Sequence, residues 1–506
     1  MGLSDYDISI NNPEFENEQS SYEILRTANT NGVFQVESQG MKELLVRLQP
    51  SCMDDLSAVL ALYRPDTMGA MEQFIENKHH PEKMTYIHPD MEPILGQSYA
   101  CLIYQEEILD IVRKFGGRSY GKADLFRKAI GKKNADLVRQ ESEKLYQEII
   151  DNGYSEKIAK SISDELAEKG GYCFNKSHSY SYAVLCFQTA FLKKHYPVYF
   201  FKALLNLNKD DSGKMNKYII EAKNNGVEVL PPSINHSDTN FSVHNGKILF
   251  GLSAIAGIGE KVTKEIIAER TMNGKFKGFD DFCERVSPTK TQVINLVKSG
   301  AIPTKNKREF LERYFAPKAK EYKPVEKMPT KAMLRKYNIN PDEYGYSEEV
   351  LAAYNKVRKL EFDEKEKTRQ AKEMEKNTKY LQDEQFWEYE ALRIFINNNP
   401  FEKALPYIDN NWDSAEIGEK CVIVGIISSV QKKKDKNKRQ FAFINIYSPF
   451  GIIEAVLWAS MYAKYEELVK KGTQIAAVCT KEAEDKLTIT ELKTFKEWLR
   501  DREIEV

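Results

Sequence analysis

The sequence lacks the features that mark secreted, membrane-spanning or metal-centred proteins. Its seven cysteines are scattered, and no two form a Cys-x-x-Cys pair that would indicate a zinc site or a redox centre. No apolar run approaches the roughly 18 to 20 residues that span a bilayer, and the first residues are polar and acidic, unlike a signal peptide. We therefore expect a cytoplasmic protein with reduced thiols and no membrane contact.

An excess of positive charge is also absent. Lys and Arg total 74 against 75 Asp and Glu, so a nucleic-acid partner would have to be recognised by local clusters of cations. A chain of 506 residues exceeds what one hydrophobic core supports, and roughly three to five domains of about 100 to 150 residues are expected.

The hydrophobic pattern changes along the chain. Residues 20–225 show apolar positions at helical spacing, and the shorter unit 226–302 mixes extended segments with a helical pair. Residues 303–417 are highly charged and predict a long solvated helix that connects rather than packs. The last part contains five β-rich runs with a helical segment between the third and fourth, the order of an OB-fold: KCVIVGIISSV, RQFAFINIYS, GIIEAVLW, TQIAAVCTK and KLTITELKTF. The sequence predicts a multidomain, mainly α protein with a C-terminal five-stranded β OB-fold.

Two polar clusters in the helical part suggest an anion site. Arg127, Lys128, Lys132 and Lys133 lie within two helical turns, where their charges would converge on one anionic group such as a triphosphate. A solvated helix face is the alternative interpretation of this cluster.

The second cluster precedes an apolar helix. Its residues Asn175, Lys176, Ser177 and His178 would place hydroxyls and a cation beside the free N–H groups of a helix N-terminus. Simple helix capping and a structural histidine are the alternatives here.

The stretch LFGLSAIAGIGEKVTKEIIAER predicts a helix-hairpin-helix. Gly257 and Gly259 allow a tight turn, so that N–H groups of the second helix can meet a DNA phosphate, with Lys261 and Thr263 adding contacts that do not read sequence. A turn that merely packs two helices is the alternative. The segment 279–302 resembles a second, degenerate member of a tandem pair.

A basic loop precedes two aromatic residues in the β-rich part. We expect the loop after the first strand to carry Lys432, Lys433, Lys434 and Arg439, directly before Phe441 and Phe443 on the second strand. Cations that follow phosphates beside rings that stack on bases suit a single-stranded nucleic acid. Either phenylalanine could instead face the core of the barrel, although alternation places both on the same face.

Five segments, in their order and spacing, resemble the family C DNA polymerases, the alpha subunits of bacterial polymerase III. They are GVFQVESQGMKELLVRLQP (32–50), LALYRP (60–65), YQEEIL (104–109), ADLFRKAIGKK (123–133) and FNKSHSYSYA (174–183). The resemblance implies a palm remnant or palm-docking segment at 1–40, fingers at 41–225, helix-hairpin-helix DNA binding at 226–302, a charged helical connector at 303–417 and the OB-fold at 418–506.

The resemblance implies a DNA-directed DNA polymerase, a nucleotidyltransferase that uses Mg²⁺. Arg127 and Lys128 would grip the incoming dNTP, where the family usually has two arginines, and Lys132, Lys133, Asn175, Lys176, Ser177 and His178 would line the same pocket. Primer-template DNA would contact the hairpin, and single-stranded template the barrel. Family members also bind a sliding clamp through a short peptide, for which QDEQFW (382–387) is a weak match.

The catalytic carboxylates of the family, a D-x-D pair and a third Asp before an L-G-L segment, are missing. The opening MGL resembles the tail of that segment, and Asp5 and Asp7 follow no strand that could present them to a metal. The resemblance therefore assigns no catalytic and no metal-binding residue to this chain. We expect it to be inactive alone and to act with a separate N-terminal polypeptide that carries the palm; a truncated chain fits equally well.

One other function remains open, and a second fits the sequence poorly. The chain could be a non-catalytic DNA-binding or scaffold protein retained from a polymerase. A DNA ligase also combines helix-hairpin-helix and OB units, but the sequence has no K-x-D-G motif.

Overall fold

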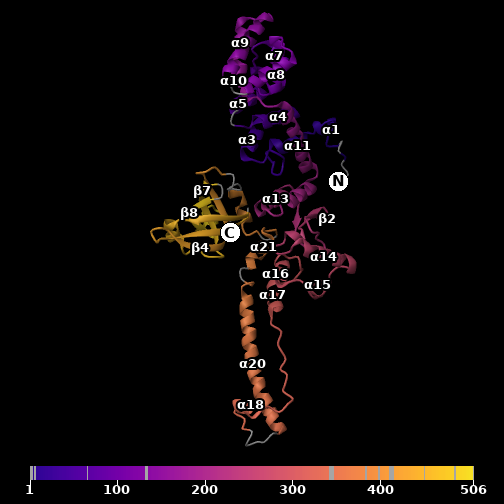
Figure 1. Cartoon of the computed structure of the whole chain (residues 1–506), viewed down its shortest axis with the longest axis vertical. Helices are drawn as coiled ribbons and strands as arrows, with labels where there is room; N and C mark the ends of the chain where they lie inside the picture. The colour runs from indigo at the N-terminus through magenta and orange to yellow at the C-terminus, as the bar shows by residue number, and fades with distance from the viewer. Residues whose placement is uncertain are drawn as a thin grey trace. The chain divides into compact units, whose positions relative to one another are not determined.

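The chain folds into two compact units in this computed structural model (Figure 1). The first unit comprises residues 1–207, 217–228 and 413–416, and the second comprises residues 208–216, 229–412 and 417–506. The structure describes residues 4, 7–64, 67–131, 135–340, 347–381, 384–396, 399–408, 415–449, 451–483 and 486–504.

The first unit is helical, as the apolar periodicity predicts. Its helices are α1 (Pro13–Glu16), α2 (Gln19–Arg26), α3 (Gln39–Leu48), α4 (Met53–Leu62), α5 (Met68–His79), η2 (Pro81–Lys83), η3 (Pro89–Met91), α6 (Glu92–Leu95), η4 (Gly96–Ser98), α7 (Gln105–Gly116), α8 (Tyr120–Gly131), α9 (Ala135–Asp151), α10 (Glu156–Lys169), η5 (Gly170–Tyr172), α11 (Lys176–His195) and α12 (Pro197–Leu207). Helix α13 (Ser212–Asn224) has residues in both units.

Two hydrophobic cores hold the first unit together. One is built around α11, where Phe187 lies 5.1 Å from Phe15 and 4.4 Å from Tyr22, ring centre to ring centre. Residues of α1 and α2 therefore belong to the same core as α11, within the segment that the sequence assigns to the palm remnant. The other core joins α7 to α10 and buries Phe115 and Phe126 completely.

The second unit begins with a small sheet in the order β1-β3-β2, formed by β1 (Val229–Leu230), β2 (Ser242–His244) and β3 (Lys247–Leu249). It continues with η6 (Leu252–Ala254), α14 (Glu260–Asn273), α15 (Phe279–Val286), α16 (Lys290–Lys298) and α17 (Lys307–Phe315). Ile255 and Ile258 are buried on either side of the turn that leads into α14, so apolar side chains anchor this hairpin.

A long arm follows α17 (Figure 1). It comprises an extended strap from residue 316, the short helix α18 (Lys331–Lys336) and the 31-residue helix α20 (Glu348–Thr378). The strap runs along α20, because the Lys320 N–H donates to Glu366 and the Val325 N–H donates to Asn355. The charged segment is thus a helix with mixed charges, as the sequence predicts.

The C-terminal part is a closed barrel with strand order β4-β5-β6-β8-β7. Its elements are β4 (Lys420–Lys434), β5 (Gln440–Ser448), β6 (Gly451–Leu457), α22 (Ala459–Tyr465), β7 (Gln474–Ala483), β8 (Lys486–Thr494) and the terminal helix α23 (Phe495–Arg500). Alternate residues of each strand face the interior, for example Ala442, Ile444 and Ile446 of β5. The predicted five strands, with a helix between the third and fourth, are confirmed.

The prediction of a solvated connector is wrong for residues 386–396 and 399–408. This stretch contains α21 (Trp387–Leu392) and η8 (Glu402–Tyr407), preceded by η7 (Glu384–Phe386), and it packs with the barrel in a shared core that includes Phe401 and Phe495. Phe386 is 3% exposed and Trp387 is 1% exposed. These are the aromatic residues that a clamp-binding peptide would have to present, and both are buried here; Gln382 and Asp383 lie outside the described residues, and clamp binding stays a prediction.

Across the described ranges, no helix combines the length and apolar character that crossing a bilayer requires. All seven cysteines are free thiols.

Candidate nucleotide and DNA sites

The basic pair on α8 is held in place by a carboxylate of the same helix. Arg127 donates from Nε and Nη2 to one Asp124 oxygen at 3.0 and 2.8 Å, and Lys128 Nζ lies 2.7 Å from the other. The salt bridges to Lys128 and Arg127 hold the pKa of Asp124 below its usual value. Both cations are therefore oriented before any ligand arrives, and an anion would have to compete with Asp124 for them.

The polar cluster at 175–178 forms the N-terminus of α11. Asn175 is the N-cap, and its side-chain oxygen accepts hydrogen bonds from the His178 N–H at 2.9 Å and the Ser177 hydroxyl at 2.6 Å. Ser177 and His178 are exposed, and the His178 ring lies between Phe174 and Tyr182. Asn175, and not Ser177 or Ser179, caps the helix, and the outward faces of Ser177 and His178 stay open.

Two adjacent residues of α7 hold these two clusters together. Gln105 accepts a hydrogen bond from Arg127 Nη1 at 2.9 Å and donates its own backbone N–H to the Phe174 carbonyl at 2.8 Å. Glu106 accepts from the Asn175 amide at 3.0 Å and from the Lys176 N–H at 2.8 Å. The basic pair of α8 and the N-terminus of α11 are thus fixed side by side on the first turn of α7.

Three lysines remain of the predicted nucleotide site, and the structure describes one of them, Lys176. Lys176 is half-buried; its Nζ donates to Gln97 at 2.8 Å and lies 3.8 Å from Asp54. Lys132 and Lys133 lie outside the described residues. The sequence analysis missed Asp124, Gln105 and Glu106, although the spacing of Asp124 three and four residues before Arg127 and Lys128 is a known signal for helical ion pairs.

The first turn of α7 contains a buried carboxyl group. Glu107 is 6% exposed and accepts hydrogen bonds from the N–H groups of Ile103 and Tyr104, both at 2.9 Å. Burial raises the pKa of Glu107 to about 7. This residue caps the helix that joins the two clusters, so its protonation state bears on the stability of the site.

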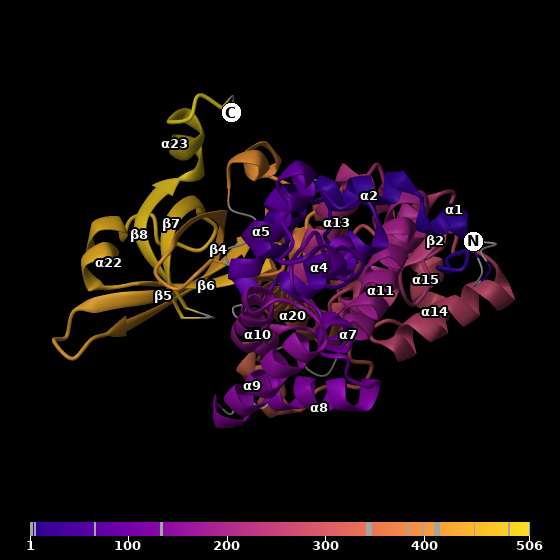
Figure 2. The same ribbon diagram turned by 90° about the horizontal axis from the view of Figure 1, so that it is seen from above.

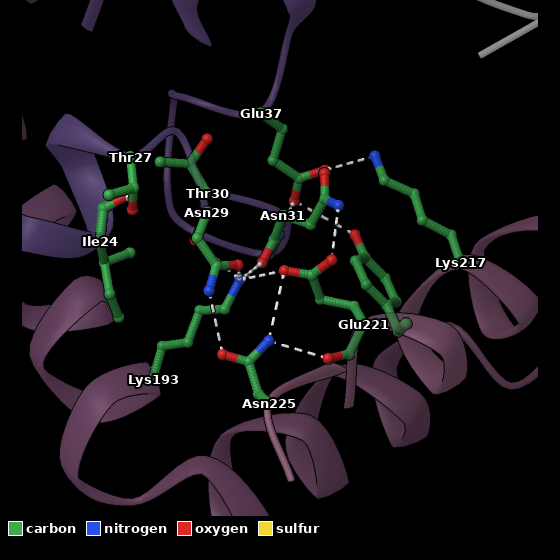
Figure 3. Close-up of polar contacts among 12 residues, drawn as sticks. Ile24, Thr27, Asn29, Thr30, Asn31, Glu37, Lys193, Lys217, Glu221 and Asn225 are labelled. Atoms are coloured by element: carbon green, nitrogen blue, oxygen red, sulfur yellow. Dashed lines mark hydrogen bonds and ion pairs between the residues drawn. The ribbon is translucent and has the colours of Figure 1, made fainter. Parts of the chain in front are cut away.

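A buried polar network fixes the loop between α2 and α3 (Figure 3). The Lys193 ammonium of α11, fully enclosed, donates to the carbonyls of Asn29 and Asn31 at 2.9 Å and lies 2.7 Å from Glu221 of α13. Burial lowers the pKa of Lys193. The loop contains Gly32 at φ +79°, a conformation that favours glycine.

The same network extends outward through the loop. Glu37 accepts from the Gly32 N–H at 2.7 Å and from Lys217 at 3.2 Å, and Asn31 donates to Glu221 at 2.9 Å (Figure 3). The loop that carries the GVFQVES segment is therefore held by polar contacts with α11 and α13, rather than by an apolar core alone.

The helix-hairpin-helix has the predicted turn. Gly257 adopts φ +73°, and Gly259 is the N-cap of α14, with open space where a side chain would be. Lys261 is exposed. The prediction that Thr263 contacts DNA is wrong, because its side chain is fully buried and its hydroxyl donates to the Gly259 carbonyl at 2.8 Å.

The cations of the barrel lie partly on a strand, not in a loop as predicted. Lys432, Lys433 and Lys434 end β4, where Lys433 pairs with Phe441 of β5. The β4–β5 hairpin extends beyond the rest of the barrel (Figure 2). Arg439 follows in the turn and forms an ion pair with Asp435 at 2.8 Å.

Both predicted aromatic residues lie on the outer face of the barrel. Phe441 and Phe443 alternate with the buried Ala442 and Ile444, and neither enters the core. Trp458, which follows β6, stacks on Phe441 with 5.3 Å between ring centres and an angle of 30°, and it is 40% exposed. Lys433 lies over Phe443 at 4.6 Å and Lys486 over Trp458 at 5.4 Å. Phe443, Phe441 and Trp458, flanked by these cations, form what we call the aromatic face.

The described residues contain no group of three His, Cys, Asp or Glu side chains that could hold a metal ion. Asp7 accepts hydrogen bonds from the Ser4 N–H and hydroxyl at 2.7 and 2.8 Å, a local turn, and Asp5 lies outside the described residues. A magnesium site built from three such ligands would therefore need carboxylates from outside the described residues.

Comparisons with known proteins cover most of this chain. A family described as "Bacterial DNA polymerase III alpha subunit finger domain" matches residues 4–153, and one described as "Helix-hairpin-helix motif" matches residues 226–309. The DNA polymerase III subunit alpha of Aquifex aeolicus is 34% identical over 466 residues, which cover 89% of this chain and 36% of that protein.

Two further relatives carry the same name and match a similar share of the chain. The DNA polymerase III subunit alpha of Chlamydia muridarum is 29% identical and matches 96% of this chain, and that of Staphylococcus aureus strain MRSA252 is 30% identical and matches 89%. The chain spans 38% and 40% of these two proteins, so it corresponds to somewhat more than a third of their length.

Proposed function

The chain belongs to the family of bacterial DNA polymerase III alpha subunits, and on this premise we propose that it binds an incoming dNTP and primer-template DNA as part of a replicative DNA polymerase. Magnesium and the carboxylates that hold it come, in this proposal, from a palm outside residues 1–506, on the same longer polypeptide or on a separate one. The chain alone then binds substrates and does not extend a primer.

One observation carries the dNTP part of the proposal. Gln105 and Glu106, neighbours on α7, hold Arg127 of α8 and the N-terminus of α11 next to each other. A guanidinium is complementary to phosphate oxygens, whereas the Lys176 and His178 N–H groups of α11 are already bonded to Glu106 and Asn175. The exposed Ser177 and His178 stand at the same end of α11 and complete a polar surface for a nucleotide.

The DNA part of the proposal uses two further surfaces. The first turn of α14 presents backbone N–H groups beside Gly259 and Lys261, which suits a duplex phosphate without base readout. The aromatic face of the barrel suits the unpaired template strand, because stacked rings accept any base and the neighbouring lysines follow the phosphates.

Primer extension tests the dNTP assignment when this chain is combined with a palm-bearing alpha-subunit fragment. Arg127→Ala removes charge-assisted hydrogen bonds of about 1.5–3 kcal/mol, so the KM for dNTP should rise roughly tenfold to a hundredfold. Arg113→Ala is the matched control, because Arg113 also pairs with an aspartate three residues before it, on the neighbouring helix α7.

Two outcomes would contradict the proposal. Absence of any extension by the combined sample would count against a polymerase. Equal kinetics for both arginine variants would instead favour a non-catalytic DNA-binding or scaffold protein.

A further inference from the structure

A basic cleft lies at the base of the arm, where α20 returns to the hairpin helices. It has a volume of about 840 Å³ and is lined by Lys290 at the start of α16 and by residues 369–380. Five cations, Lys290, Arg369, Lys372, Lys376 and Lys379, face two carboxylates, Glu373 and Glu375. The cleft therefore carries an excess of positive charge in a chain that has none as a whole.

Three cations of α20, together with Lys379 at its C-cap, form a stripe. Positions 369, 372, 376 and 379 are separated by three, four and three residues, which places them on one face of a helix. Arg369, the first cation of the stripe, pairs with Glu366 and Glu373, and Lys365, outside the stripe, pairs with Glu361. Within the described ranges, by contrast, Lys372, Lys376 and Lys379 form no ion pair, and all three are exposed.

Aromatic and amide contacts fix the hairpin side of the cleft. Lys290 hydrogen-bonds to Asn377, and its Nζ lies 5.0 Å from the ring centre of Phe315 and 5.1 Å from that of Tyr380. These contacts hold the end of α20 against the first residue of α16, the second helix of the degenerate hairpin. The cleft is thus continuous with the hairpin region that we propose above to bind DNA.

We propose that this cleft binds the phosphate backbone of duplex DNA and extends the hairpin surface along the base of the arm. The inference rests on the proposed DNA-binding function and adds to it a site on α20, beyond the residues 226–309 that match the helix-hairpin-helix family. Flexible lysines recognise phosphate as point charges, so the site contributes affinity without sequence preference. Its contribution falls steeply with salt because each neutralised phosphate releases counterions.

The test is the salt dependence of duplex binding by the full chain. A triple variant, Lys372→Ala with Lys376→Ala and Lys379→Ala, is compared with the unmodified chain by fluorescence anisotropy between about 50 and 200 mM salt. Three lost phosphate contacts should reduce the slope of log K against log salt by about three.

The matched control removes the same charge from the same helix. Lys356→Ala with Lys359→Ala and Lys367→Ala also changes three exposed lysines of α20, outside the cleft. It should leave affinity and slope unchanged, and the three lysine-to-arginine substitutions within the cleft should retain binding. Thermal unfolding of each variant reports whether the helix itself has been weakened.

The outcomes are distinct. If the unmodified chain binds duplex DNA and both triple variants bind it with the same slope as the unmodified chain, the cleft is not a DNA site, although the hairpin function stands. Equal losses in both triple variants would show a nonspecific charge effect and would also overturn the inference. If the unmodified chain does not bind duplex DNA, the proposed DNA-binding function fails, and the inference fails with it.

Discussion

The helical first unit and the barrel use cations in opposite ways. In the helical unit, Arg127 and Lys128 are held by Asp124, and Lys193 is enclosed among carbonyls and Glu221. In the barrel, Lys433 and Lys486 lie over aromatic rings on an open face. The difference suits the two kinds of ligand proposed above. Orienting the cations in advance reduces the entropy cost of binding a ligand of fixed geometry, and an adaptable surface suffices for a flexible strand.

The largest expected effect tests the enclosed side of this comparison. Lys193→Met leaves Glu221 buried without its partner, and such a loss costs about 3–5 kcal/mol. Chemical denaturation of the full chain should show this loss in the helical unit and leave the barrel transition unchanged. Lys194→Met is the neighbouring control, since Lys194 pairs with an exposed Glu23, and it should cost less than about 1 kcal/mol. Equal effects would mean that the network does not hold the helical unit.

The pH dependence of the helical unit sharpens the comparison, because no such buried acid is described in the barrel. The folded pKa of Glu107 is about 7, above its unfolded value, so the folded state binds the proton more tightly. Its contribution to the free energy of unfolding therefore falls as pH rises from about 4.5 to 7, by about 3 kcal/mol in total, and is constant above. Glu107→Gln should remove this dependence, so its advantage over the unmodified chain grows across that window. Parallel stability curves from pH 4 to 8 would refute the assignment.

The open side of the comparison is tested at the aromatic face. Trp458→Ala should weaken binding of single-stranded DNA by about 1–3 kcal/mol, the usual value for one base stacked on a ring. Ile452→Ala is the control, because Ile452 is a large exposed side chain of β6 that cannot stack. Fluorescence titration with a short oligonucleotide measures both, and similar losses would show that exposed apolar area, not stacking, matters.

The smallest expected effect concerns Asp124, whose carboxylate would compete with a triphosphate for Arg127 and Lys128. Asp124→Asn removes the carboxylate that holds Arg127 and Lys128, so a triphosphate should bind several-fold more tightly if competition dominates. Weaker binding would show that orientation by Asp124 matters more than competition. Asp110→Asn, which breaks the similar pair with Arg113, is the control in the same dNTP titration.

Periodicity predicted most of the fold because it reports which residues are buried. The five strands follow from alternation such as Ala442, Ile444 and Ile446, and the turn at Gly257 follows from a backbone that requires φ above zero. The prediction of a solvated connector failed at Phe386 and Trp387, because a short apolar segment lies within a stretch that is charged on average. The prediction that Thr263 contacts DNA failed because the exposure of a side chain depends on its position on the helix face, not on its residue type.

The sites were only partly predictable. The sequence singles out Arg127 and the residues at 175–178, but their joint contact with Gln105 and Glu106 arises from tertiary packing of α7, α8 and α11. Lys193 and Glu221 are 28 residues apart, and nothing in their local pattern pairs them. The contribution of Trp458 to the aromatic face could have been predicted from the sequence. The β5–β6 hairpin pairs Ala442 with Leu457, and this register places Phe441 beside Trp458.

The arm leaves and returns at one point, where Phe315 and Tyr380 lie 5.8 Å apart, ring centre to ring centre. Whole turns could therefore be added to or deleted from α20, with matching changes in the strap, without altering the spacing between the hairpin and the barrel. Such changes would lengthen or shorten the projection, while the contact between these two rings would still hold both ends of the arm together.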